Sequence, residues 1–130
     1  MKADKSILAK IKPFYIYSKD LENSEPIISF ALKRYFVQQA LVIKKSNQGK
    51  FTEQMDNTIS SILTEAEEFK KSCQITETEV IKQLQDFLKK NFASVIKEEE
   101  ESPKIGKEFA AKFQFIRNII IVYLYFKNDD

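Results

Sequence analysis

The spacing of apolar residues constrains the fold of this 130-residue chain more than any other feature of its sequence. Apolar residues recur three and four positions apart along most of the chain, and they almost nowhere alternate with polar residues over a long run. The first pattern is typical of helices with one buried face, whereas alternation is typical of half-buried strands. The sequence therefore predicts an all-α fold built from five helices.

Local signals indicate where the first three helices lie. We expect a first helix over residues 11–23 and a second that begins at Ser24 as N-cap, with Pro26 in its first turn. A proline costs little there, because the first N–H groups of a helix have no partner within the helix. The turn-rich segment SNQGK, residues 46–50, then precedes a third helix over residues 52–73.

Two further helices are predicted in the remainder of the chain. Thr76 with Glu79 three residues later forms a capping box just before apolar residues, so a fourth helix should begin there. We expect the charged run KEEEES, residues 97–102, to interrupt that helix as a solvated connection. The Ser-Pro pair at 102–103 then indicates a fifth helix that extends to about Phe126.

The residue types that are missing exclude several chemistries. The chain has no His, only one cysteine (Cys73) and only two glycines, Gly49 and Gly106. The chain therefore lacks the residues needed for a zinc site, for His-based acid/base catalysis or for a glycine-rich phosphate loop. The lone cysteine fits a reducing compartment, and the N-terminus lacks the apolar run of a signal peptide. We expect an intracellular protein that is not an enzyme and needs no cofactor or metal.

Charge and apolar run length argue against nucleic acid and against a membrane span. Charged residues make up 31% of the chain but balance to a net charge of +2, and nineteen of the cations are Lys. Most aromatic residues fall on predicted core faces rather than among the lysines, so base stacking is not expected. The apolar run at 119–126 is far shorter than the roughly 20 residues that a span requires.

The second helix carries more apolar surface than one packing face needs. Twelve of the seventeen residues from Ile27 to Ile43 are apolar, whereas a surface helix usually needs one apolar stripe. Besides a broad face that could pack on two helices, a separate narrow stripe contains Phe30, Val37 and Leu41. Two interpretations stay open: the stripe packs on another helix of the chain, or it lines a groove for a partner helix.

The third helix favours the groove interpretation somewhat. Its apolar stripe leaves Leu63 on the flank, beside Asp56 and Glu67. Such an arrangement suits an amphipathic partner, because its leucines would bury area while an Arg or Lys binds a carboxylate. An ordinary boundary leucine among surface acids is the alternative. The candidate partner-helix groove consists of six residues: Phe30, Val37, Leu41, Asp56, Leu63 and Glu67.

The run KPFYIYSKDLENSEPIISFALKRYFVQQAL, residues 12–41, resembles the start of the Vta family of vacuolar-protein-sorting proteins, also called LYST-interacting proteins. The resemblance continues through the end of the third helix and through residues 87–126. Lys33 and Arg34 stand where the family often has Arg-Leu, and Ala40 where a Gly can occur. The residues that match the opening signature are Lys12, Pro13, Leu21, Glu25, Pro26, Phe30, Tyr35 and Gln38.

This resemblance implies both a fold and a function. The N-terminal region of the family contains two tandem MIT modules, three-helix bundles that bind C-terminal helical tails of ESCRT-III subunits in multivesicular-body sorting. One class of tail lies between the second and third helices of a module, with leucines in apolar pockets and a basic residue facing acids. We therefore expect an MIT-type antiparallel three-helix bundle over residues 1–75. Residues 76–130 should form a second MIT-like module with two helices and without its third.

The resemblance also implies partners and a location. A separate C-terminal region of the family, not expected in this chain, binds and stimulates the AAA ATPase that disassembles ESCRT-III filaments. The chain should be cytoplasmic and peripherally associated with endosomes. A generic helical interaction module or a homo-oligomeric scaffold unrelated to ESCRT-III is the alternative. Self-association is expected through apolar residues spread around the fifth helix: Ile119, Val122, Leu124 and Phe126.

Overall fold

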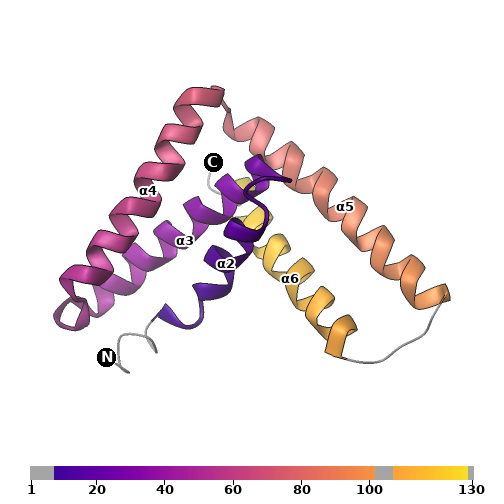
Figure 1. The fold of residues 1–130 in the computed structure, drawn as a ribbon, viewed down its shortest axis with the longest axis horizontal. Coiled ribbons are helices and arrows are strands. Elements are labelled where there is room, and N and C mark those ends of the chain that lie inside the picture. The colour runs from indigo at the N-terminus through magenta and orange to yellow at the C-terminus, as the bar shows by residue number, and fades with distance from the viewer. Residues whose placement is uncertain (1–7, 102–106, 129–130) are drawn as a thin grey trace. The chain divides into compact units, whose positions relative to one another are not determined.

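A computed structural model describes residues 8–101 and 107–128 of the chain. No strand occurs among these residues, so the predicted all-α fold is confirmed. The chain divides into two compact units, residues 1–75 and 76–130. The elements are the helices α2 (Lys12–Asp20), α3 (Pro26–Ser46), α4 (Glu53–Cys73), α5 (Glu77–Glu101) and α6 (Lys107–Asn128), with a short 3₁₀ turn η1 (Gln48–Lys50) before α4 (Figure 1).

The first unit is an antiparallel three-helix bundle in which α3 is the central helix (Figure 1). It packs against α2 on one side and against α4 on the other, and short connections reverse the chain at each end. This central position accounts for the excess apolar surface of the second predicted helix. The buried apolar residues of α3 are Ile28, Phe30, Ala31, Leu32, Phe36, Val37 and Ala40.

Polar contacts also join the three helices of this unit. The hydroxyl of Ser29 on α3 donates a hydrogen bond of 2.6 Å to the carbonyl oxygen of Ser18 on α2. Lys33 is only 7% exposed, and its Nζ lies 3.0 Å from Glu22 Oε1 and 3.7 Å from Glu65 Oε2. A buried charge is costly unless it is paired, so the two carboxylates make the burial of Lys33 tolerable. The hydrogen bond and charge of Lys33 in turn lower the pKa of the Glu22 carboxyl.

Two of the predicted helix starts have side-chain caps, of which only the cap at Thr76 was predicted. The hydroxyl of Thr52 accepts a hydrogen bond from the backbone N–H of Met55 at 3.2 Å. The hydroxyl of Thr76 accepts one from the backbone N–H of Glu79, also at 3.2 Å. Each contact satisfies one of the backbone donors that the first turn of a helix leaves without a partner. The sequence therefore located these two starts correctly.

Other helix ends differ from the prediction, beginning with α2, which ends at Asp20 rather than at residue 23. The N-cap of α3 is Glu25 rather than Ser24, and no side chain caps it; the proline at the following position already removes one unpaired donor. The acidic run was expected to interrupt the fourth helix, but α5 continues through Glu101. Glutamate is a good helix former, and no glycine or proline occurs within the run. The predicted start of the fifth helix at 102–103 lies outside the described residues.

The second unit contains α5 and α6, which pack against each other. The ring of Phe87 on α5 meets that of Phe115 on α6 edge-on, with centroids 6.0 Å apart. Phe92 on α5 is exposed. Among the described residues of this unit, five large apolar side chains are exposed: Phe92, Ile96, Phe113, Ile120 and Leu124.

The residues expected to support self-association do not form one accessible surface. Ile119, Val122 and Phe126 are buried, and of the four only Leu124 is exposed. Three of the four side chains are thus already covered within the chain, so the predicted surface is not available to a partner as a whole. Among the described residues, no helix has both the length and the apolar character that crossing a membrane would require.

Candidate partner-helix site

The α3–α4 face is built from one row of side chains on each of two neighbouring helices. Positions three and four apart share a face of a helix, so each row runs along the length of its helix. Because α3 and α4 are antiparallel, the start of one row lies opposite the end of the other. The α3 row is Phe30, Arg34, Val37, Leu41 and Lys44, and the α4 row is Asp56, Ser60, Leu63 and Glu67.

The apolar members of the predicted groove separate into buried and accessible residues. Phe30 and Val37 are only 5% and 3% exposed, and the Phe30 ring lies 5.7 Å from that of Phe69 on α4. For these two, packing within the same chain is the correct interpretation. Leu41 is 44% exposed and Leu63 is half-buried, so both could contact a partner.

Both predicted carboxylates already have partners within the chain. Arg34 Nη1 donates a hydrogen bond of 3.1 Å to Glu67 Oε1, and Lys44 Nζ lies 2.8 Å from Asp56 Oδ1. Each ion pair joins α3 to α4. Pairs this exposed contribute about 0–1 kcal/mol each, so a partner could replace them at little cost. Sequence reasoning missed these pairs because they depend on which residues of α3 and α4 come level after packing.

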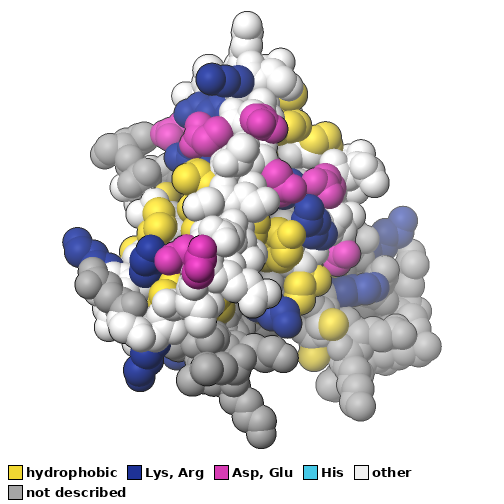
Figure 2. All heavy atoms as spheres, turned by 60° about the vertical axis from the view of Figure 1, so that its left-hand side comes forward, with side chains coloured by type: hydrophobic (Ala, Val, Ile, Leu, Met, Phe, Trp, Pro, Cys, Tyr) yellow, Lys and Arg dark blue, Asp and Glu magenta, His cyan; other side chains and the backbone are white. Residues whose placement is uncertain are grey.

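The two ion pairs bound an apolar stretch of the α3–α4 face. Arg34 and Lys44 are ten positions apart, which is roughly 15 Å along a helix. The accessible side chains of Leu41 and Leu63 belong to the rows between them. Figure 2 shows acidic and basic side chains next to one another on the first unit, with hydrophobic side chains exposed between them. This arrangement can bind an amphipathic helix of about three turns.

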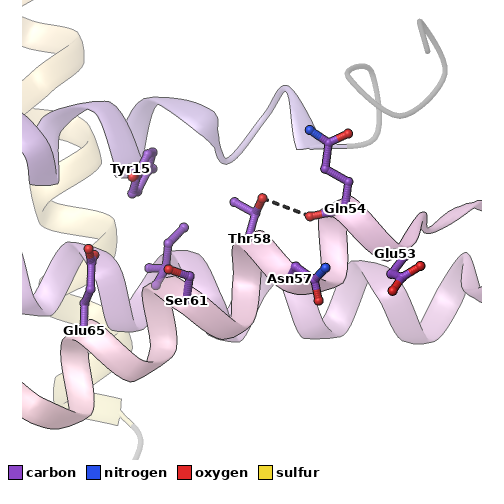
Figure 3. A pocket seen from close by; sticks show the side chains of 8 residues that line it. Tyr15, Glu53, Gln54, Asn57, Thr58, Ser61 and Glu65 are labelled. Atoms are coloured by element: carbon purple, nitrogen blue, oxygen red, sulfur yellow. Dashed lines mark hydrogen bonds between the residues drawn. The ribbon is translucent and has the colours of Figure 1, made fainter.

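A second hollow, between α2 and α4, was not predicted. One pocket of about 520 Å³ lies beneath Tyr15, whose ring points from α2 toward α4 (Figure 3). Its α4 wall is polar, and the hydroxyl of Thr58 there donates a hydrogen bond of 2.9 Å to the carbonyl oxygen of Gln54. The residues lining it are Tyr15, Glu53, Gln54, Asn57, Thr58, Ser61, Ile62 and Glu65.

The hollow continues toward the start of α2. An adjoining pocket of about 560 Å³ shares Tyr15 with the first and has an apolar side formed by Phe36, Met55 and Ile59. The difference in helix length is the signal that could have revealed it, because α2 has 9 residues and α4 has 21. A helix this short cannot cover the whole length of its neighbour. Within the described part of the chain, no group of His, Cys, Asp or Glu could hold a metal ion.

Comparison with known proteins adds one finding to this geometry. A protein-family model with the description "Vta1 like" matches residues 10–130. Comparisons with curated proteins and with solved structures give no match. The family match spans both units, and it includes all residues of the α3–α4 face.

Proposed function

Because the chain belongs to the Vta1-like family, we propose that its first unit binds C-terminal helical tails of ESCRT-III subunits on the α3–α4 face. The family is regulatory, and its members act with the ESCRT-III machinery and the AAA ATPase that disassembles it. The chain is thus a helical module of a regulator. Tail binding would make it an adaptor in that machinery.

One observation carries this proposal: Leu41 and Leu63 are accessible on neighbouring helices, and an ion pair flanks them at each end. Burying a leucine side chain is worth about 1.5–3 kcal/mol, so two such contacts could supply much of a micromolar affinity. The charged residues at the ends would add orientation and specificity rather than affinity. In the family that the sequence resembles, the same face of a three-helix module receives one class of tail.

This adaptor would act in multivesicular-body sorting and membrane remodelling. We place it in the cytoplasm, on the surface of endosomes, because its partners assemble there. Stimulation of the AAA ATPase would belong to a different region of the protein. The chain itself would bring ESCRT-III tails close to that enzyme.

The direct test is an NMR titration of the ¹⁵N-labelled chain with a panel of ESCRT-III C-terminal peptides. We expect the largest amide shifts on α3 and α4, around Leu41 and Leu63. Amide shifts confined to the hollow between α2 and α4 would show that the peptide binds there and not on the α3–α4 face. Absence of binding across the panel would refute tail binding by this chain.

Self-association is a second candidate function, favoured by the exposed apolar residues of the second unit. Phe92 and Ile96 on α5 and Phe113, Ile120 and Leu124 on α6 remain exposed, and a second copy of the chain could bury them. Sedimentation equilibrium over a hundredfold range of protein concentration distinguishes a monomer from a self-associating chain. A single monomeric species throughout would reject the scaffold function and leave tail binding unaffected.

A further inference from the structure

The charges of the α3–α4 face are segregated by helix. Both cations of the face, Arg34 and Lys44, lie in the α3 row, and both anions, Asp56 and Glu67, lie in the α4 row. The remaining members of the two rows between the ion pairs are uncharged: Val37, Leu41, Ser60 and Leu63. The face therefore has its cations on the α3 side and its anions on the α4 side, in contact with each other at the two ends of an apolar centre.

A helix that docks on this centre must contact both edges. Covering Leu41 and Leu63 partly removes water from the flanking ion pairs, and a charge that loses its partner there becomes costly. A partner carrying only basic residues would satisfy Asp56 and Glu67 but face Arg34 and Lys44 with like charge. A partner with acidic residues on one side of its leucine seam and basic residues on the other would pair with all four.

Building on the proposed function, we propose that the partner is an amphipathic helix with acids on one edge and bases on the other, and that these signs fix the direction in which it lies. Turning a helix end for end on the face exchanges its two edges. Only one direction then sets its acids against the α3 cations and its bases against the α4 anions. The other direction creates like-charge contacts at both ends.

The spacing of the ion pairs specifies the length of this partner. The cations are ten positions apart on α3, and Asp56 and Glu67 are eleven positions apart on α4. Both separations correspond to about three helical turns. The partner should therefore carry charges of each sign about 10 residues apart, with leucines between them at spacings of three and four.

The test uses two synthetic helices of about sixteen residues, long enough for these charge pairs and one flanking turn. One has glutamates on one edge of a leucine seam and lysines on the other, and the second has the signs exchanged. Each peptide carries a nitroxide spin label at its N-terminus, attached before mixing with the ¹⁵N-labelled full chain. We expect the first peptide to broaden amide signals near one end of the α3–α4 face. The sign-exchanged peptide should broaden those near the opposite end.

Two variants of the chain sharpen this experiment. The swapped variant combines Arg34→Glu with Glu67→Arg and Lys44→Asp with Asp56→Lys, which keeps both ion pairs and the net charge. With this variant, each peptide should broaden amide signals at the end of the face opposite to the one it broadens in the unchanged chain. The neutral variant, Arg34→Gln, Glu67→Gln, Lys44→Gln and Asp56→Asn, should give weaker broadening at both ends. Exchanging the charges of Lys82 and Asp86, two exposed residues one turn apart on α5, is the control and should change nothing.

The possible outcomes separate this inference from the proposed function. Broadening at the same end with both peptides overturns the inference, and so does the absence of binding by either peptide. If the synthetic helices reverse direction as expected but no ESCRT-III tail binds, the inference stands and the proposed function fails. If ESCRT-III tails bind but both synthetic peptides broaden signals at the same end of the face, only the inference fails.

Discussion

Leu63 is the residue whose replacement best tests the α3–α4 face. It is half-buried, so Leu63→Asp should leave the bundle folded while placing a charge where a partner leucine would pack. Losing about 1.5–3 kcal/mol of apolar burial corresponds to a decrease in affinity of roughly 10-fold to 140-fold. Calorimetric titration with a tail peptide measures this loss. Leu124→Asp, at an exposed site in the second unit, is the matched control and should bind normally.

Lys33 supports the fold rather than the partner site. Lys33→Glu would bury a negative charge beside Glu22 and Glu65, and breaking a buried pair in this way costs about 3–5 kcal/mol. We expect a decrease in melting temperature of more than about 10 °C, followed by circular dichroism. Lys45→Glu, at an exposed position of the same helix, should shift the melting temperature little. Equal melting temperatures for the two variants would show that the Lys33 pairs contribute nothing.

Glu22 should make the stability of the first unit depend on pH. Its folded-state pKa lies below the usual 4.5, because Lys33 donates a hydrogen bond to it and attracts its negative charge. The unfolded chain therefore takes up the proton first, so this stabilisation is present above the unfolded pKa and is lost as the pH falls through the folded one. Urea unfolding between pH 6 and pH 3 should show a smaller loss of stability for Glu22→Gln than for the unchanged chain. Parallel curves would contradict this assignment.

At the scale of helices, the sequence predicted which segments are helical better than it predicted the contacts between the helices. Periodicity and the capping box at Thr76 are local, so they indicated the helices without knowledge of packing. The burial of Phe30 and Val37 could not be decided, because a wheel shows a stripe but not which neighbour covers it. The ion pairs of Arg34 and Lys44 could not be predicted from the sequence, because they depend on the register of two packed helices.

The cap of α5 gives a prediction at this same scale. Thr76→Ala removes the acceptor for the Glu79 N–H and should destabilise the second unit by about 1 kcal/mol. Amide hydrogen exchange in the first turn of α5 should become several-fold faster. Thr78→Ala lies two residues further on, at an exposed site within the helix, and should leave exchange nearly unchanged. Similar exchange in both variants would mean that the cap has no energetic role.

At the scale of the whole molecule, the two units divide the proposed tasks. Every residue of the α3–α4 face lies in residues 1–75, whereas five of the exposed large apolar side chains lie in residues 76–130. Tail binding and any self-association would therefore use different parts of the chain. A surface substitution in one unit should leave the function of the other intact, because effects of distant sites usually add.

This division predicts that residues 1–75 fold and bind on their own. The unit has three helices packed through a continuous apolar core that includes Ile28, Leu32 and Ile62, and its buried lysine is paired within it. A domain of this size can be stable, although only marginally. The isolated segment should show cooperative thermal unfolding and bind a tail peptide within about threefold of the full chain's affinity, a difference below 1 kcal/mol. A folded segment that has lost binding would show that the second unit contributes directly to the site, and an unfolded one would show that the first unit depends on the second for its stability.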